Sequence, residues 1–288
     1  MSDERQAGPQ ERPEASGTNT DQIDGTVRGA ALCVLAPNPS MMTLEGTNTW
    51  IVAAPGAASA IVVDPGPDDE GHLRRVHDLA VAGGRRVEQI LLTHGHHDHS
   101  DGARRMAALA GAPVLAADPA HRHGGGGLGP GDVLTAAGVE IQVVATPGHS
   151  GDSVCFLMPA DGVLLTGDTV LGHGTTVIAH DGHLGDYLGS LDRLRALADS
   201  AALTALLPGH GPLLSDPAGT LDYYIGHRRE RLAEVREALA AGDRTLADIV
   251  ARVYADISRD LWPFAEWSVR AQLTYLGERG ELPPDMRT

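Results

Sequence analysis

Short apolar runs, separated by Gly and Pro, follow one another from residue 30 to residue 207. Apolar runs of this length, bounded by turn residues, are typical of buried strands. The predicted strands are 30–35, 49–53, 60–63, 87–93, 113–117, 132–135, 139–145, 153–158, 162–166 and 203–207. Apolar positions at helical spacing predict helices over 69–82, 101–110 and 186–198. The Gly-rich segment 121–131 is expected to be a mobile surface loop.

The pattern becomes wholly helical after residue 217. Apolar stripes predict helices over 220–240, 245–254 and 264–278, and the short 280–282 segment suits a small wing or turn. At the other end, residues 1–27 are polar and charged, with little to bury. The pattern therefore predicts three parts, which are a disordered polar tail (1–27), a strand-rich domain (28–217) and a helical C-terminal domain (218–288).

Composition and charge narrow the class of protein. The chain is 42% apolar and 21% charged, so it can bury a sizeable core. It carries 38 acidic and 22 basic residues, all of the latter Arg, for a net charge of −16. Such a field repels polyanions at long range, so we do not expect duplex DNA as a partner.

The two cysteines, Cys33 and Cys155, lie in apolar runs and are expected to be buried core residues without a disulfide framework. The N-terminus shows no apolar segment of a signal peptide, and no run approaches the roughly 20 apolar residues of a membrane span. We therefore expect a cytoplasmic protein without a membrane partner. The sequence does not indicate an oligomeric state.

Histidines concentrate at one place in this pattern. The chain has 14 His residues, and four of them stand with one Asp within positions 93–99, directly after a predicted strand. Alternate positions of an extended segment point the same way, so His94 and His96 can reach one cation together. Asp98 and His99, at the turn into the next helix, can face a second cation beside it. This mixed His/Asp pattern favours a metal site over a surface cluster.

Three further strand-end loops offer the same kinds of ligand. His149 follows the strand 139–145, Asp168 follows 162–166, and His210 follows 203–207. A single His after Gly is commonly a turn residue, but four strand-end loops presenting His and Asp together favour convergence on metal ions. All these donors are N or O atoms, which suits zinc and also manganese or iron. The remaining histidines expected on the surface are His72, His77, His121, His123, His180 and His183.

With its His-x-His-x-Asp-His motif and the three loops, the segment 30–217 resembles the metallo-β-lactamase superfamily. The resemblance implies an α/β, four-layer αββα sandwich with two zinc ions at its loop edge. It implies that the first ion is bound by His94, His96 and His149. It implies that Asp98, His99 and His210 bind the second, with Asp168 bridging the two. No Cys lies among these loops, so β-lactam hydrolysis itself is not expected.

Three longer motifs are similar to those of the β-lactamase-like protein 2 family: one at 38–49, one at 167–176 and one at 224–228. This likeness implies a winged-helix-like C-terminal unit packed over the site. Relatives in that family include single-strand RNA endonucleases and fungal enzymes that release acyl chains from carrier proteins. The likeness therefore predicts a dinuclear-zinc hydrolase that uses a metal-bridged hydroxide. His173 and His227 are candidate catalytic or substrate-contacting residues, and surface positions are equally plausible for both.

Three functions remain open. The first is a phosphodiesterase or endoribonuclease acting on single-stranded RNA, although residues 1–217 hold 26 acidic and 12 basic groups. The second is an acyl-thioester hydrolase of the hydroxyacylglutathione-hydrolase kind, acting on a small ester or thioester. The third is a non-catalytic nucleic-acid-binding regulator. The complete set of seven metal ligands counts against this function. Asp98 is expected to orient the attacking water in either enzyme.

Overall fold

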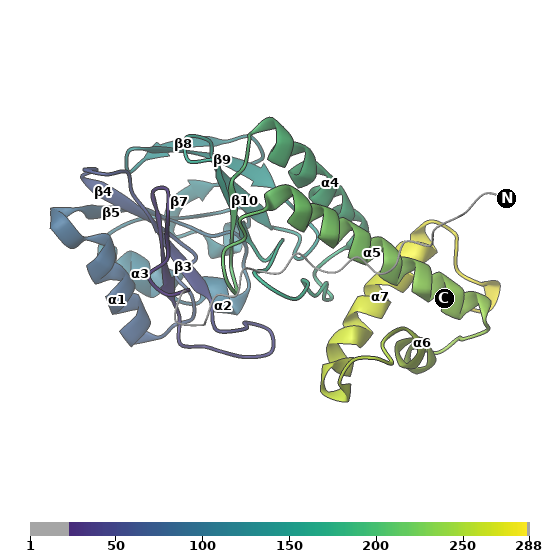
Figure 1. Cartoon of the computed structure of the whole chain (residues 1–288). Coiled ribbons are helices and arrows are strands. Elements are labelled where there is room, and N and C mark those ends of the chain that lie inside the picture. The colour runs from purple at the N-terminus through teal and green to yellow at the C-terminus, as the bar shows by residue number, and fades with distance from the viewer. Residues whose placement is uncertain (1–22, 287–288) are drawn as a thin grey trace.

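Two β-sheets pack face to face in the computed structural model, which describes residues 23–286 (Figure 1). The first sheet has seven strands in chain order: β1 (Val27–Arg28), β2 (Ala31–Leu35), β3 (Asn48–Val52), β4 (Ser59–Val63), β5 (Arg86–Leu91), β6 (Val114–Ala116) and β7 (Gly124–Gly127). The second sheet has the order β12 (Ala205–Pro208), β11 (Val163–Gly167), β10 (Val154–Met158), β9 (Val139–Ala145) and β8 (Val133–Ala136). All ten predicted strands are confirmed, with ends shifted by one or two residues.

Helices cover the outer face of each sheet (Figure 1). The helices α1 (Glu70–Ala80) and α3 (Ala103–Ala110) pack on the first sheet. The helices α4 (Leu184–Ser200) and α5 (Pro217–Ala240) cover the second, and α6 (Leu246–Val253) and α7 (Trp262–Glu278) follow at the C-terminus. The αββα sandwich with a helical C-terminal unit is therefore confirmed.

Three apolar clusters account for this layering. Residues of β3, β4 and β9–β12 that point inward form the cluster between the sheets, which includes Trp50, Phe156 and Met158. Alternate residues of the same strands point outward, and those of β4 and β5 meet α1 and α3. Because both faces are covered, β3, β4, β10 and β11 are buried at every position.

Parallel pairing brings the functional loops to one edge of the sandwich. The strand β4 pairs parallel with β5, and β11 pairs parallel with β12. The carboxyl ends of parallel neighbours lie at the same edge of a sheet, which is where open α/β sheets bind ligands. The loops that follow these four strands hold Asp64, His94, Asp168 and His210.

The Gly-rich segment is the clearest error of the predicted pattern. Its residues 124–127 form β7, an edge strand that pairs parallel with β6, and a 3-10 helix (Pro119–His121) precedes it. A Cβ atom at Gly125 would lie 2.5 Å from the Val114 carbonyl oxygen, so glycine permits this close approach. The expectation of a surface loop over 121–131 was wrong for residues 124–127, because a strand made of glycines has no side chains to show an apolar pattern; most of this strand is exposed, as expected of a surface segment.

Two further expectations need correction. Residues 1–22 of the predicted tail lie outside the described residues, but Ile23 is buried and β1 begins at Val27, so residues 23–27 take part in the fold. His72, expected on the surface, is 4% exposed on the inner face of α1. Its Nε2 lies 3.0 Å from the Thr49 hydroxyl, which explains how a polar ring is accommodated there.

The C-terminal unit is not separated from the sandwich at residue 217. The helix α5 packs on α4 with its first half and on α6 and α7 with its second half (Figure 1). One apolar cluster runs from Leu164 of β11 to Leu276 of α7. Residues 280–282 form a turn after α7 rather than a paired wing. Over residues 23–286, no helix is long and apolar enough to cross a membrane.

Candidate metal centre

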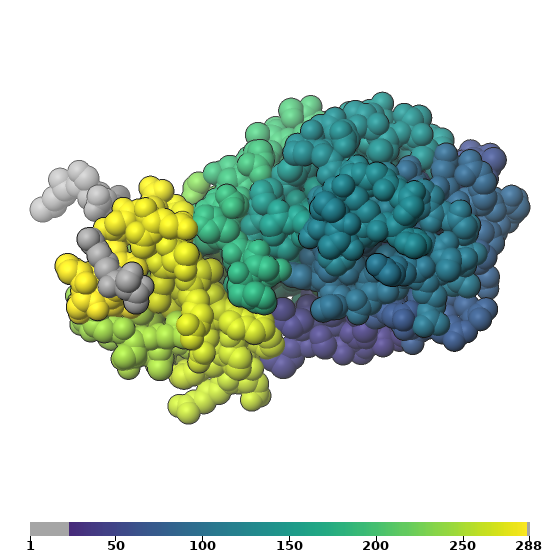
Figure 2. Space-filling model, turned by 180° about the vertical axis from the view of Figure 1, so that it is seen from behind, coloured from purple at the N-terminus to yellow at the C-terminus, as the bar shows by residue number. Residues whose placement is uncertain are grey.

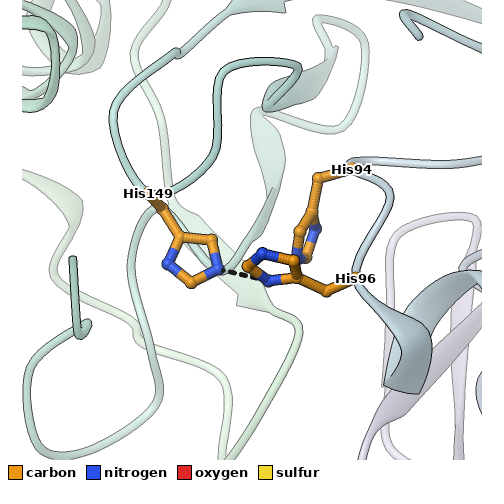
Figure 3. A group of neighbouring side chains, drawn as sticks. All are labelled: His94, His96 and His149. Atoms are coloured by element: carbon orange, nitrogen blue, oxygen red, sulfur yellow. Dashed lines mark hydrogen bonds between the residues drawn. The ribbon is translucent and has the colours of Figure 1, made fainter. Parts of the chain in front are cut away.

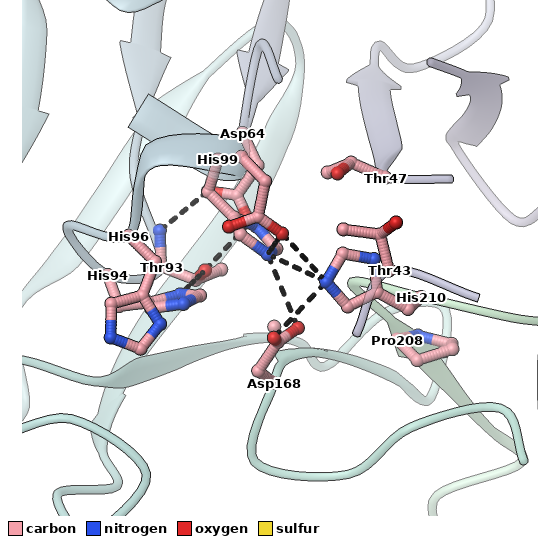
Figure 4. A network of polar contacts seen from close by, with 12 residues as sticks. Thr43, Thr47, Asp64, Thr93, His94, His96, His99, Asp168, Pro208 and His210 are labelled. Atoms are coloured by element: carbon pink, nitrogen blue, oxygen red, sulfur yellow. Dashed lines mark hydrogen bonds and ion pairs between the residues drawn. The ribbon is translucent and has the colours of Figure 1, made fainter. Parts of the chain in front are cut away.

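The seven predicted ligands converge at the loop edge in two groups (Figures 3 and 4). The first group holds His94, His96 and His149; the second holds Asp98, His99, Asp168 and His210. Within each group, the donor atoms lie within 4.8 Å of one another. The chain between β5 and α3 supplies four of the seven, because the short helix α2 (His97–Ser100) turns Asp98 and His99 back toward the strand ends.

In each neutral imidazole of the first group, the outer nitrogen carries the proton. The nitrogen that faces inward therefore has none. The His149 Nδ1 lies 3.0 Å from the Val177 carbonyl oxygen, and the His96 Nε2 lies 2.7 Å from the Asp181 carboxylate. Both oxygens can only accept, so these outer nitrogens donate. The inner nitrogens, His149 Nε2 and His96 Nδ1, then carry lone pairs, and these two atoms lie 3.0 Å apart (Figure 3).

His94 completes this group in the same way. Its Nδ1 lies 3.0 Å from the Thr93 hydroxyl, which itself donates to Asp64 and therefore accepts from His94. The His94 Nε2 is buried and has no hydrogen-bond partner among the described residues. Three lone pairs that converge without a donor are the arrangement that a metal ion satisfies.

The second group is built on the same principle. The His99 Nδ1 lies 2.9 Å from Asp64, and the His210 Nδ1 lies 3.1 Å from the Gly46 carbonyl oxygen. The two inner Nε2 atoms lie 3.2 Å apart (Figure 4). The Asp98 carboxylate is 3.0 Å from the His210 Nε2. Lone pairs and carboxylates at these distances repel one another unless positive charge lies among them.

Asp168 lies between the two groups. One of its carboxylate oxygens, Oδ2, is 3.2 Å from the His210 Nε2 and 3.7 Å from the His149 Nε2. The His94 and His99 rings, one from each group, are 4.3 Å apart between centroids. A carboxylate in this position can contact ions held by both groups, as the resemblance to the family implies.

The pKa shifts show how strongly the second group attracts positive charge. Burial lowers the pKa of His210, but the Asp168 and Asp98 carboxylates outweigh burial and raise it to about 9. The same carboxylates and Asp64 raise the pKa of His99 well above its usual range. The His94 pKa is lowered by burial and by the neighbouring imidazoles. Without a cation, protons supply the missing positive charge at His99 and His210, so metal binding there releases protons.

Two carboxylates that support the centre were not singled out from the sequence. Asp64 accepts hydrogen bonds from the Thr93 backbone N–H and hydroxyl as well as from His99, and it is 1% exposed. Asp181 holds the His96 ring from the far side. Asp64 follows a buried strand just as Asp168 does, so its position was a signal, whereas nothing in the sequence around Asp181 marks its role.

The loop that carries Asp168 is fixed by α4 and α5. The Tyr224 hydroxyl accepts from the Leu171 backbone N–H at 2.9 Å, and the Tyr187 hydroxyl donates to the Thr169 carbonyl oxygen at 2.7 Å. The buried Arg228 guanidinium donates to the Thr176 carbonyl oxygen and lies over the Tyr187 ring. Side chains of α4 and α5 therefore determine where the Asp168 loop lies.

The two further candidates, His173 and His227, lie outside both groups of ligands. His173 is half-exposed, and its Nε2 lies 2.9 Å from the Glu45 carboxylate. His227 stacks on Tyr223, and burial together with Arg228 and Arg231 lowers its pKa to about 4. A neutral His227 at pH 7 cannot donate a proton as an imidazolium ion. The positions of His173 and His227 do not test whether either residue contacts the substrate or takes part in catalysis.

The fold and this His/Asp site together define a metal-dependent hydrolase of the αββα class. Residues 42–210 match the model of the metallo-beta-lactamase superfamily, and residues 245–281 match that of the beta-lactamase associated winged helix domain. The chain belongs to the metallo-beta-lactamase superfamily and carries its associated winged-helix domain.

Relatives by sequence cover most of the chain. The beta-lactamase-like protein 2 homolog of Drosophila melanogaster is 29% identical over 86% of this chain and 88% of its own length. The lactamase-like protein vrtG of Penicillium aethiopicum is 33% identical over 79% of this chain and 74% of its own. The atrochrysone carboxyl ACP thioesterase of Aspergillus fumigatus is 30% identical over 79% and 74%.

Solved structures share the fold. A beta-lactamase domain protein from Burkholderia ambifaria superposes with a TM-score of 0.75, covers 94% of this chain and 93% of its own, and is 23% identical. A metallo-beta-lactamase family protein from Thermus thermophilus gives a TM-score of 0.71 at 21% identity, over 87% of this chain and 94% of its own. At identities below 25%, these superpositions establish a shared fold alone.

Proposed function

We propose that this protein is a dinuclear-zinc hydrolase and that its substrate is a phosphodiester of single-stranded RNA. The observation that carries the metal site is Asp168, which lies between two groups of inward-facing lone pairs. The donor set fits metal ions, because the His94 Nε2 is buried without a partner among the described residues and the His99 and His210 Nε2 atoms face each other beside two carboxylates. Nitrogen and oxygen donors of this kind suit zinc, and they also accept manganese or iron.

His94, His96 and His149 would hold one ion, Asp98, His99 and His210 the other, and Asp168 both. Two divalent cations at such a centre supply an acidified water and polarisation of the scissile bond. The chain's own contribution is orientation. The pKa of Asp98 is lowered despite its burial, by His99 and His210, so this carboxylate is ionised at neutral pH and can accept a hydrogen bond from the attacking water.

The RNA substrate is supported by the likeness to the β-lactamase-like protein 2 family, which extends through the C-terminal helices. These helices carry 12 acidic and 10 basic residues over 218–288 and are thus closer to neutrality than the rest of the chain. An anionic strand would therefore meet less repulsion on the α5–α7 side. Duplex DNA remains unexpected as a substrate, and we keep the cytoplasm as the proposed location.

An acyl thioester is the second candidate, because a relative that is 30% identical is named as an ACP thioesterase. The lowered pKa of His227 also favours it. A thiolate leaving group has a pKa near 8.5 and departs without protonation, whereas an alkoxide needs an acid. The neutral His227 does not provide that acid at pH 7.

The test offers purified protein both a single-stranded oligoribonucleotide and a panel of acyl thioesters. We expect hydrolysis of one class, loss of it on chelation, and recovery with zinc. Asp98→Ala should lower kcat by about 100-fold or more, and His94→Ala should abolish activity on whichever substrate the wild type hydrolyses. Hydrolysis that persists in Asp98→Ala indicates a contaminant, and near-normal rates in His94→Ala contradict the ligand assignment. Nucleic-acid binding without any hydrolysis in the zinc-loaded protein would support the regulator instead.

A further inference from the structure

A pocket of about 290 Å³ separates the loop 179–184 from the helix α7. Its lining is Ala179, His180, Gly182, His183, Leu184, Trp267, Arg270, Ala271 and Thr274. Figure 2 shows this region from behind, where the teal-green surface of the sandwich adjoins the yellow C-terminal helices. The volume lies just below the roughly 300–1,000 Å³ of small-molecule sites, so the pocket suits one small unit of a larger substrate.

The loop on one side of the pocket is attached directly to the metal centre. Gly182 lies against the backbone of His149, because a Cβ atom there would be 2.5 Å from the His149 carbonyl oxygen. The His183 backbone N–H donates to the Gly148 carbonyl oxygen at 2.8 Å, and Asp181 holds His96. One short loop therefore contacts both the metal centre and the pocket.

The other side of the pocket presents an aromatic ring beside a cation. Trp267 is 42% exposed, far more than is usual for a ring of its size. Arg270, one turn further along α7, is exposed and makes no ion pair among residues 23–286. His180 likewise has no partner in that range. Of the nearby carboxylates, Glu278 pairs with His183 and Asp181 with His96, whereas Glu266, one turn before Arg270 on α7, makes no ion pair among the described residues.

We propose that this pocket binds a nucleoside monophosphate unit of the substrate, with the base stacked on Trp267 and the phosphate held by Arg270. Aromatic side chains stack on any base, and a guanidinium group binds phosphate through paired hydrogen bonds. The proposal deepens the proposed function and rests on hydrolysis occurring at the metal centre one loop away.

A second hollow, which adjoins the same loop beside His96, is unsuited to the same group. A hollow of about 520 Å³ beside His96 is lined by three carboxylates, Asp118, Asp152 and Asp181, and no Arg lines it. A phosphate would be repelled there. The difference in charge between the two hollows thus favours the one beside α7 for a nucleotide.

Binding of adenosine 5′-monophosphate to the zinc-loaded protein tests the proposal without turnover. We expect saturable binding in calorimetry, with a Kd that rises about tenfold or more in Arg270→Gln and in Trp267→Leu. Both side chains are exposed, so the melting temperature should not change. Arg259→Gln is the matched control, because Arg259 lies 5.2 Å from the Trp262 ring outside the pocket. Equal Kd values in wild type and both pocket variants would overturn the proposal, as would inorganic phosphate or adenosine binding as tightly as the nucleotide.

Kinetic measurements distinguish two kinds of substrate that carry a nucleotide unit. For an oligoribonucleotide, or alternatively for an acyl thioester of coenzyme A, Arg270→Gln should raise KM about tenfold and leave kcat nearly unchanged. An acyl thioester that lacks a nucleotide should show the same KM in both proteins. Whichever nucleotide-bearing substrate shows the effect identifies the source, and a KM unchanged for both overturns the proposal. Failure of all hydrolysis with intact nucleotide binding would contradict the proposed function alone.

Discussion

Outward hydrogen bonds fix which nitrogen of each imidazole points into the metal centre. Asp64 and Asp181 do this for His99 and His96, and backbone carbonyl oxygens do it for His149 and His210. Partners of this kind set the tautomer and the ring orientation of a metal-binding histidine. The centre therefore depends on residues that would not touch an ion themselves.

Asp181 gives the sharpest residue-scale prediction. Asp181→Asn leaves the fold intact but weakens the hold on the His96 ring, so the affinity for the ion of the first group should fall about 10–100-fold. Competition with a chromophoric chelator measures this affinity. Asp152→Asn is the control, because Asp152 lines the same hollow and contacts Ser150 rather than a candidate ligand. Equal affinities in the two variants would show that Asp181 does not position His96.

At the scale of elements, α5 supports the loop that carries Asp168. Tyr224→Phe removes the hydroxyl that meets the Leu171 backbone N–H in a buried place. The unfolding free energy should fall by about 1–3 kcal/mol, because a buried donor loses its partner. Urea unfolding measures this loss.

Tyr223→Phe serves as the control for that experiment. Tyr223 is the neighbouring residue, is partly exposed, and makes no hydroxyl hydrogen bond within residues 23–286. Its substitution should change stability by less than about 0.5 kcal/mol. A comparable loss in both variants would argue against a specific support of the Asp168 loop by Tyr224.

His72 on the helix α1 makes the unfolding free energy depend on pH. Burial lowers the pKa of His72 to about 4, so the fold favours the neutral ring. This stabilisation is present above pH 6.5, where the unfolded ring is also neutral, and is lost as the pH falls toward 4. Relative to His72→Gln, the wild type should lose about 2 kcal/mol of stability between pH 7 and pH 5.

Chelator-treated protein isolates this effect from metal release. His77→Gln, on the same helix, is the control and should follow the wild type. If the difference between wild type and His72→Gln does not change with pH, the ring is not held neutral in the fold.

The elements that the sequence predicts well are those with side-chain periodicity. Buried strands such as β4 and β11 are marked by continuous apolar runs, and their ends locate the candidate ligands. The strand β7 was missed because Gly has no side chain to show a pattern. The inward position of His72, the hydrogen bond of Tyr224 and the role of Asp181 depend on packing between segments far apart in sequence, which local pattern does not encode.

In the whole molecule, the apolar cluster that spans β11, α4, α5 and α7 joins the sandwich to the C-terminal unit. The helix α5 has buried residues along its entire length, from Leu221 to Leu239. Two parts that share one core unfold together. We therefore expect the C-terminal unit to unfold together with the sandwich and not as an independent unit.

Scanning calorimetry of the metal-free protein checks this expectation. We expect a single transition whose calorimetric and van't Hoff enthalpies agree. Two resolved transitions, one of them insensitive to Tyr224→Phe, would show that the C-terminal unit is independently stable.

The whole account depends on two ions at one centre, and the metal content of the reconstituted protein measures this most directly. Elemental analysis after zinc loading and removal of free metal should give two ions per chain in the wild type. His149→Ala and His210→Ala should each retain about one, because each removes a ligand from a different group. No bound zinc in well-folded wild type, or two ions retained in both variants, would contradict the account.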